Sequence, residues 1–292
     1  MLRLKGVIPA ILTPFDENCE IEGRAFEELC NYLIEKNVGG LFVAGTTGEG
    51  PLLSLDERAK LFKLAVKYSK GRVPIIAHVG SISLKETIAL IKSAIEARVD
   101  AIAIVSPYYY RLDEKAIEEY YIEVLEEVKE IPVFLYNIPG LTNNSITPNL
   151  AQKLFNQGKI NGIKDSSGNI TVIKSFIDIS PEFQVVSGTD ELFLLALTLG
   201  AVGAVSSTAN IFPEIFNNIY NAFINRDMGL AVENQRKLNE LCKIFQYGRF
   251  IASYKYALSL RGLKISSRVR SPQRDLTEEE KDIIKESIKN FI

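Results

Sequence analysis

Short apolar runs alternate with amphipathic segments from the first residues of the chain to beyond residue 200. The runs are mostly β-branched, which is typical of strands that are covered on both faces. The segments between them repeat apolar residues at helical spacing, as in Phe26, Leu29, Cys30 and Leu33. This pattern predicts eight strands, over residues 7–12, 40–44, 74–79, 101–105, 132–136, 162–164, 183–187 and 201–205.

Several of the intervening helices carry recognisable start signals. Ser54 is followed three residues later by Glu57, and Ser83 stands in the same relation to Glu86, so both pairs predict capping boxes. The pair at 147–148, a threonine followed by proline, predicts a cap with proline in the first turn. These signals place helices directly after the second, third and fifth strands.

The regular alternation decides the fold class. Eight successive βα units with short connections predict a closed (β/α)8 TIM barrel, because an open sheet would need a long crossover where the strand order reverses. The strand pattern ends near residue 209, and helical patterns follow. We therefore expect a barrel domain over residues 1–225 and a C-terminal helical extension over residues 226–292 that packs on it.

Composition narrows the possible partners and the compartment. A net charge of -2, from 34 basic and 36 acidic residues, gives no broad field for nucleic acid. There are three scattered cysteines, Cys19, Cys30 and Cys242, and one histidine, His78, and they form no zinc motif. The odd, scattered cysteines favour a reducing cytoplasm. His78 lies in an apolar run and is interpreted as a core histidine. No uninterrupted apolar run approaches the roughly 18 residues of a membrane span, so we expect a cytoplasmic protein without a membrane partner.

In such a barrel the active site lies at the carboxyl ends of the strands. Lys164 ends the sixth predicted strand, where burial would disfavour the charged ammonium and leave a nucleophilic amine. The alternative is a strand-end lysine that merely reaches solvent. Tyr136 ends the neighbouring strand, where a phenol could transfer protons beside that amine, although packing alone also explains a tyrosine.

A glycine-rich stretch, residues 45–50, follows the second strand. Its glycines can expose backbone N–H groups, and Thr46, Thr47 and Gly48 together predict a cradle for a carboxylate or a phosphate. An ordinary tight turn is the alternative. The ends of the seventh and eighth strands are small and polar, which suits a polyol or a carboxylate. The candidate substrate-binding residues there are Gly188, Asp190, Glu191 and Ser206, whereas Thr189 and Ser207 are as well explained as helix N-caps.

A buried lysine, a neighbouring tyrosine and a carboxylate cradle suit covalent catalysis on a 2-oxo acid. The amine would condense with the ketone, and the protonated imine would act as the electron sink for making or breaking a carbon–carbon bond. This chemistry predicts no metal and no dissociable cofactor, only a covalent imine between Lys164 and the 2-oxo acid.

The motifs GTTGE (45–49), PYY (107–109), YNIP (136–139) and GIKD (162–165) resemble, in order and spacing, those of the pyruvate-dependent class I aldolase family. That family includes dihydrodipicolinate synthase, N-acetylneuraminate lyase and 2-keto-3-deoxygluconate aldolase, and the resemblance covers residues 4–225. It implies that Lys164 is the Schiff-base lysine, that Tyr136 and Thr46 transfer protons, and that Thr47 binds the carboxylate. It also implies that Tyr109 reaches into a neighbouring subunit's site, in a homotetramer built from dimers.

Substrate choice depends on the positions after the YNIP motif. In the dihydrodipicolinate synthases that this chain resembles, an arginine follows the motif. This chain instead has Gly140, Leu141 and Thr142. The prediction is therefore a lyase that reversibly cleaves a 2-keto-3-deoxy sugar acid, such as 2-keto-3-deoxygluconate, to pyruvate and an aldehyde. Three alternatives stay open: a dihydrodipicolinate synthase that uses aspartate semialdehyde, a phosphate-binding barrel enzyme without an imine, and a non-catalytic 2-oxo-acid-binding protein.

Overall fold

The structure, a computed structural model, describes residues 2–129, 131–246 and 250–292. Within these residues eight parallel strands form one sheet in the order β1-β8-β7-β6-β5-β4-β3-β2. The strands are β1 (Gly6–Pro9), β2 (Leu41–Val43), β3 (Ile75–His78), β4 (Ala101–Val105), β5 (Val133–Asn137), β6 (Gly162–Asp165), β7 (Gln184–Ser187) and β8 (Gly203–Ser206). Hydrogen bonds from Gly39 N–H to Val7 O (2.7 Å) and from Ile11 N–H to Phe42 O (3.0 Å) join β1 to β2. The predicted (β/α)8 barrel is confirmed.

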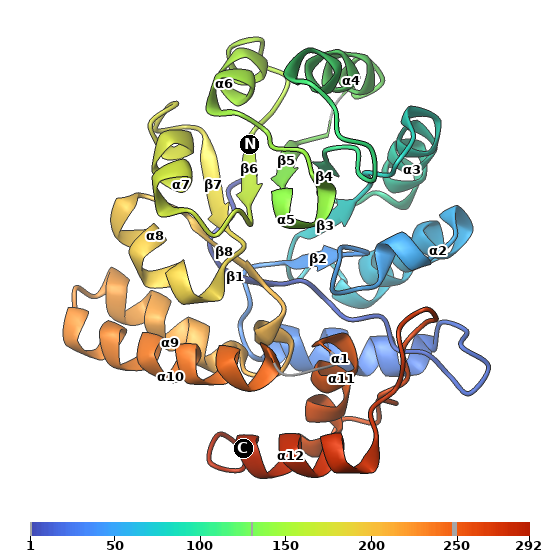
Figure 1. Cartoon of the computed structure of the whole chain (residues 1–292), viewed down its shortest axis with the longest axis vertical. Coiled ribbons are helices and arrows are strands. Elements are labelled where there is room, and N and C mark those ends of the chain that lie inside the picture. The colour runs from blue at the N-terminus through green and yellow to red at the C-terminus, as the bar shows by residue number, and fades with distance from the viewer. Residues whose placement is uncertain (1, 130, 247–249) are drawn as a thin grey trace.

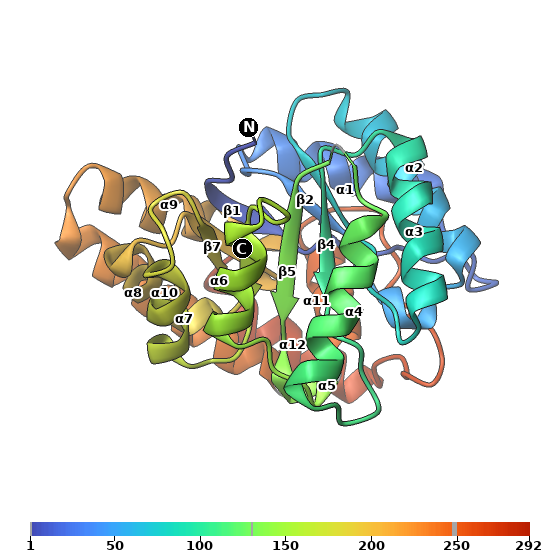
Figure 2. The ribbon, with the colours of Figure 1, turned by 90° about the horizontal axis from the view of Figure 1, so that it is seen from above.

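A ring of helices surrounds the strands (Figure 1). They are α1 (Gly23–Glu35), α2 (Leu55–Ser69), α3 (Leu84–Ala97), α4 (Glu114–Glu126), α6 (Pro148–Asn156), α7 (Ile170–Ile177), α8 (Phe193–Leu199) and α9 (Pro213–Ile224). Figure 2 shows the arrow of β5 pointing toward the end of the barrel where the short helix α5 (Pro139–Thr142) lies. The carboxyl ends of all eight parallel strands therefore open on that face.

The helix starts agree with the capping signals, with one difference. The capping box of α2 forms completely, and the cap of α6 has proline in its first turn. At α3, Ser83 accepts the Glu86 N–H (3.3 Å), but the Glu86 carboxylate accepts the Ser81 hydroxyl (2.6 Å) instead of returning to the cap. The predicted box at α3 is therefore only half formed, because a nearer hydroxyl occupies the carboxylate.

Side chains from the strands fill the barrel interior below its open face. These side chains form an inner cluster that is separate from the larger core between strands and helices. The inner cluster includes Ile8, Phe42, Phe134, Tyr136 and Val186. The first strand ends at Pro9, three residues before the predicted end. The predicted last residue, Leu12, does not bond to the sheet. Its N–H donates to the side chain of Asn210, in the segment after β8.

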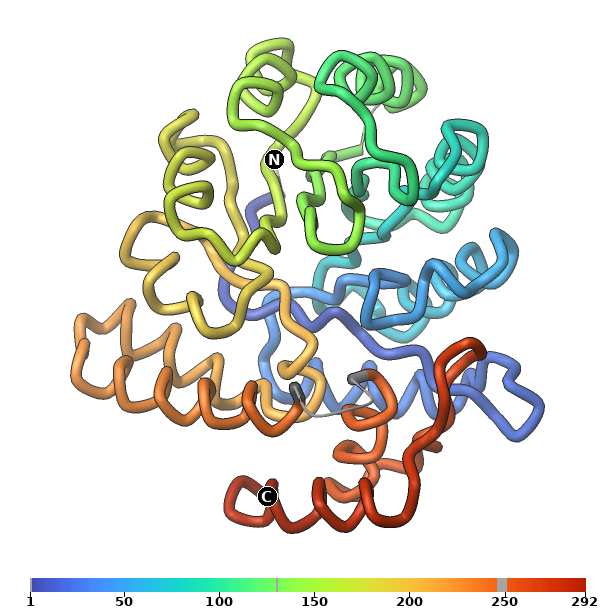
Figure 3. The backbone as a smooth tube through the Cα atoms, viewed as in Figure 1, coloured from blue at the N-terminus to red at the C-terminus, as the bar shows by residue number. Residues whose placement is uncertain are grey.

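The C-terminal extension comprises α10 (Met228–Gln246), α11 (Phe250–Leu260) and α12 (Glu278–Ile288). Helix α10 packs along α9, and α11 and α12 pack together below α1 in the view of Figure 1. The segment between α11 and α12 runs beside the loop that follows β1 (Figure 3), where the Arg268 and Arg270 side chains donate to the carbonyls of Glu17 and Cys19. None of the helices described has both the length and the apolar character to cross a membrane.

Candidate active site

Lys164 lies within β6 and points into the barrel. Its side chain is almost completely enclosed, with 6% of the residue exposed. Its amine lies 3.9 Å from the centroid of the Tyr136 ring and 4.7 Å from that of the Phe42 ring. This burial excludes the alternative of a lysine that reaches bulk solvent, and it places the amine among aromatic side chains of the barrel interior.

Tyr136 is the direct neighbour of Lys164 across the sheet. The two residues pair in the register between β5 and β6, so their side chains leave the sheet side by side. The Tyr136 hydroxyl lies 3.3 Å from Thr46 Oγ1, which belongs to the turn after β2. The structure thus brings the amine, the phenol and the threonine hydroxyl together from three strand ends, as the sequence predicts. A proton can pass between the two hydroxyls beside the amine.

The glycine turn, residues 45–50, forms the third side of this group. Thr47 is buried, and its Oγ1 lies 2.5 Å from Ser207 Oγ. A Cβ on Gly48 would lie 2.8 Å from the Ile11 carbonyl oxygen, so this close approach requires glycine.

The backbone of the glycine turn is divided between two uses. The N–H groups of Glu49 and Gly50 close the turn on the carbonyls of Thr46 (3.1 Å) and Gly45 (2.9 Å). Among the residues that the structure describes, the N–H groups of Thr47 and Gly48 have no hydrogen-bond partner. They are the turn's free donors for a small anion.

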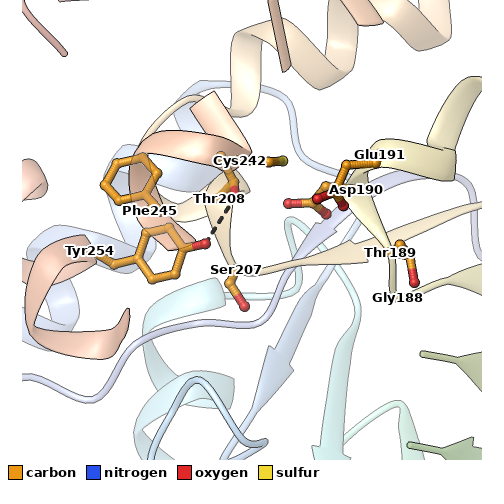
Figure 4. Close-up of a pocket in the computed structure, with 9 residues that line it drawn as sticks. All are labelled: Gly188, Thr189, Asp190, Glu191, Ser207, Thr208, Cys242, Phe245 and Tyr254. Atoms are coloured by element: carbon orange, nitrogen blue, oxygen red, sulfur yellow. Dashed lines mark hydrogen bonds between the residues drawn. The ribbon is translucent and has the colours of Figure 1, made fainter. Parts of the chain in front are cut away.

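A polar cavity adjoins this group, because Ser207 lines the cavity and contacts Thr47. Figure 4 shows the residues that line it. Its volume is about 210 Å³. The polyol cavity, as we name it here, is lined by Gly188, Thr189, Asp190, Glu191, Ser207, Thr208, Cys242, Phe245 and Tyr254. The predicted residues Gly188, Asp190 and Glu191 are among these. The lining residues of α10 and α11 were not foreseen from the sequence, because no local pattern links a C-terminal helix to a distant strand end.

Asp190 is the central acidic group of the polyol cavity. Its carboxylate accepts the Ser206 hydroxyl at 2.9 Å. Burial raises its pKa to about 6, and hydrogen bonds from Thr208 and Ser206 and the charge of Lys164 only partly oppose that rise. The carboxyl therefore changes charge just below neutral pH.

Ser206, which the sequence predicts as a substrate-binding residue, is not among the residues that line the polyol cavity. Its hydroxyl is buried, donates to Asp190 and accepts the Ala209 N–H (3.1 Å), so it supports the carboxylate from below. Ser207, one residue further, lines the cavity instead and contacts Thr47. Thr189 and Ser207 do stand at the N-cap positions of two short 3-10 helices, but neither side chain accepts a cap hydrogen bond there.

His78 is a core residue packed edge-on against Tyr136, with ring centroids 5.6 Å apart. Its Nδ1 lies 3.1 Å from both the Arg58 guanidinium and the Ala44 carbonyl. Burial first, and then the charge of Arg58, hold the pKa of the imidazole well below its usual range, so the ring is neutral. Among the described residues no group of three or more His, Cys, Asp or Glu side chains could hold a metal ion.

Tyr109 lies apart from the other predicted catalytic residues. It is 75% exposed, and its ring packs edge-on against Tyr110. Its φ of +81° lies in the left-handed region, which is strained for a bulky residue. The fold thus holds this side chain outward and does not bring it to Lys164 of the same chain.

Comparison with known proteins gives a consistent family. The model of the dihydrodipicolinate synthetase family matches residues 3–291. The chain is 36% identical over 281 residues to the 4-hydroxy-tetrahydrodipicolinate synthase of Bacillus velezensis, covering 96% of each chain. It is 32% identical over 288 residues to a probable 2-dehydro-3-deoxy-D-pentonate aldolase of Escherichia coli K12, covering 97% of this chain and 95% of the relative.

A solved structure supports the same relationship. YagE, a prophage protein of the dihydrodipicolinic acid synthase family from E. coli K12, crystallised in complex with pyruvate, superposes with a TM-score of 0.94. The two chains are 30% identical, and the match covers 98% of each. The resemblance that the four sequence motifs carry therefore extends over nearly the whole chain, including the C-terminal helices.

Proposed function

Because the chain belongs to the dihydrodipicolinate synthetase family, we propose that it is an aldolase that reversibly cleaves a 2-keto-3-deoxy sugar acid to pyruvate and an aldehyde. The chain is a pyruvate-dependent carbon–carbon lyase of this family. The proposal concerns its substrate, for which we favour an acid such as 2-keto-3-deoxygluconate, and the roles of its residues.

The mechanism begins with the neutral amine of Lys164 attacking the C2 ketone of the sugar acid. Tyr136 gives its phenolic proton to the leaving water, which leaves a protonated imine and a phenolate. The phenolate then takes the proton of the C4 hydroxyl, the C3–C4 bond breaks, and its electron pair moves into the imine to form an enamine as the aldehyde leaves. Protonation at C3 and addition of water then release pyruvate and the free amine. Thr46 relays the proton of Tyr136, at 3.3 Å, and no dissociable cofactor takes part.

The pyruvate carboxylate would lie against the glycine turn. The Thr47 hydroxyl and the free N–H groups of Thr47 and Gly48 are donors for it. Fixing the carboxylate there orients C2 toward the Lys164 amine, so binding geometry contributes directly to rate.

One observation carries the choice of substrate: among the residues that the structure describes, the lining of the polyol cavity includes two carboxylates and no cationic side chain. Aspartate semialdehyde would bring a carboxylate of its own, which the Asp190 carboxylate would repel, whereas the hydroxyls of a sugar acid can donate to it. The synthases have an arginine shortly after the YNIP motif. In this chain Leu141 lies in that region, and the leucine is 61% exposed. Both features favour a neutral polyol chain over a second anion.

Two measurements test the proposal. Borohydride reduction with pyruvate should add one reduced pyruvyl group at Lys164, identified by peptide mass. Steady-state assays of pyruvate with glyceraldehyde and with aspartate semialdehyde should then show the higher kcat/KM for the neutral aldehyde. An unmodified lysine under conditions that label a known aldolase would overturn the imine, and a preference for aspartate semialdehyde would overturn the substrate.

Synthase activity is the second candidate, and the identity of 36% to a relative named as a 4-hydroxy-tetrahydrodipicolinate synthase favours it. It would require a basic group from outside the polyol cavity to hold the second carboxylate. A coupled assay with pyruvate and aspartate semialdehyde decides between the two reactions.

We also propose that Tyr109 acts across a subunit interface. Its exposure and its strained backbone suit a side chain held out toward a partner, in a cytoplasmic homotetramer built from dimers. Size measurement in solution tests the tetramer directly.

A further inference from the structure

The glycine turn is tied to the C-terminal extension by one buried carboxylate. Glu49 is 1% exposed, and its φ of +58° lies in the left-handed region. Its Oε1 accepts the Lys255 ammonium at 2.6 Å, and its Oε2 accepts the Arg270 N–H at 2.8 Å. Both carboxylate oxygens therefore bond to parts of the chain more than 200 residues away.

Lys255, on α11, is the centre of this attachment. Its side chain is fully buried, and besides Glu49 it donates to the Arg268 carbonyl at 2.8 Å. Its ammonium also lies over the Phe15 ring, 4.2 Å from the centroid. The adjacent Arg270 side chain pairs with Glu57 at the start of α2, at 2.6 Å. The turn and the first turn of α2 are thus both bonded to the same C-terminal segment.

The position of Glu49 is coupled to that of the two threonines. Its N–H closes the turn on the Thr46 carbonyl at 3.1 Å, so its backbone cannot move without moving Thr46. Thr47 lies between them and reaches Ser207 in the cavity. If Lys255 lost its charge, Glu49 would be a buried carboxylate with only amide donors, and it would move toward water. The left-handed backbone of residue 49, which these bonds help to hold, would relax with it.

We propose that Lys255 is a positioning residue for the active site, which acts through Glu49 to hold Thr46 and Thr47 against Tyr136 and the bound pyruvate. The proposal rests on the imine mechanism proposed above, but not on the identity of the aldehyde. It assigns the C-terminal extension a role in the chemistry besides its packing on the barrel.

The test uses Lys255→Met, which keeps the length of the side chain and removes its charge. The matched control is Arg261→Met, because Arg261 also lies beside α11 and forms an ion pair, with Glu214 at 2.6 Å, but bonds to nothing in the turn. Both variants are studied as full-length protein below the melting temperature of each. The readouts are the KM for pyruvate in borohydride trapping, the trapping rate at saturation, and amide hydrogen exchange over residues 45–50.

We expect Lys255→Met to raise the KM for pyruvate at least tenfold, to slow trapping at saturation about tenfold, and to speed exchange of the Glu49 and Gly50 amides selectively. Arg261→Met should lower the melting temperature with less than twofold change in either kinetic constant. Glu49→Gln, which keeps the shape of the side chain, should reproduce the kinetic changes in milder form. The double variant should be no worse than Lys255→Met, because the two residues act through one bond.

A Lys255→Met protein that is folded and traps pyruvate with KM and rate within twofold of the wild type would overturn the proposal. If that variant does not fold, Glu49→Gln alone decides, and unchanged pyruvate kinetics in it would overturn the proposal equally. Wild-type protein that traps no pyruvate would instead refute the proposed imine. Wild-type protein that traps pyruvate but cleaves no keto-deoxy acid would refute only the proposed substrate, and the comparison of variants would stand.

Discussion

The two halves of the proposed active site are built in different ways. The imine half, Lys164, Tyr136, Thr46 and Thr47, comes from strand ends and one tight turn, and aromatic rings enclose it. The polyol cavity comes from loops and from two helices of the C-terminal extension, and hydroxyls and carboxylates line it. The first half has a rigid geometry set by the sheet register, whereas the second is assembled from parts remote in sequence.

This difference separates reaction from selectivity. A nucleophile and its proton donor must be held within a fraction of an ångström, and hydrogen-bonded strands provide that. A substrate tail needs only matching hydrogen bonds, and loops can change these without disturbing the sheet. Substitutions in the imine half should therefore alter every reaction with pyruvate, whereas substitutions in the cavity should alter only the choice and the affinity of the aldehyde partner.

The largest effect is expected at Lys164. Replacement by methionine removes the nucleophile, so kcat should fall at least about 10³-fold and borohydride should add no pyruvyl group. Replacement by arginine should be equally inactive, because a guanidinium does not lose its proton. Lys174→Met is the control, since that lysine pairs with Asp178 on the surface of α7, and it should react normally. Residual turnover above 1% in Lys164→Met would show that the imine is dispensable.

Tyr136→Phe comes next. It keeps the ring beside the amine and removes only the hydroxyl, so kcat should fall roughly 10²- to 10³-fold in both directions of the reaction. The control is Tyr121→Phe, which deletes an equally buried hydroxyl that donates to the Ile104 carbonyl at 3.1 Å on the far side of β4. That control should lose about 1 kcal/mol of stability and no activity. Equal kinetic losses in the two variants would indicate a packing effect.

Asp190→Asn should act on the other half of the site. Loss of the charged acceptor should raise the KM for the keto-deoxy acid roughly tenfold, as expected for one charge-assisted hydrogen bond. The rate at which borohydride traps pyruvate should not change, since the proposed site of the pyruvate carboxylate is the glycine turn and not the polyol cavity. If Asp190→Asn changed pyruvate trapping as much as it changed the KM for the keto-deoxy acid, the two halves would not be functionally separate.

The same carboxyl predicts a pH dependence of a few-fold. Because burial raises its pKa to about 6, Asp190 is ionised at pH 7 and takes up a proton as the pH falls toward 5. The KM for the keto-deoxy acid should therefore rise as the pH falls through about 6, and Asp190→Asn should be flat over that range. The measurement is KM between pH 5 and 8 for both proteins, and parallel profiles would assign the titration to another group.

The smallest effect concerns Tyr109, which belongs to neither half within its own chain. Tyr109→Phe should be partly impaired, and mixing it with inactive Lys164→Met during reassembly should raise activity roughly threefold above the sum of the separate proteins. The rise is expected because Lys164→Met subunits would lend an intact tyrosine to sites that retain the lysine. Strictly additive activity would confine Tyr109 to its own subunit.

The sequence predicts the barrel and the imine half because both are encoded locally. Eight strands repeat one periodic pattern, and Lys164 and Tyr136 each end a strand whose place in the ring follows from its order. The polyol cavity is less predictable. Ser206 and Ser207 differ only in which side of the strand end they face, and Cys242 and Tyr254 reach the cavity through helix packing that no local pattern specifies.

The bond between Glu49 and Lys255 also affects folding during synthesis. The two residues are 206 positions apart, so the ribosome adds Lys255 long after Glu49. At about 5 to 20 residues per second, the carboxylate waits roughly 10 to 40 s for its partner. A nascent chain can therefore complete its strands in order while Glu49 still lacks Lys255, so the bonds that hold the glycine turn to the C-terminal extension form last.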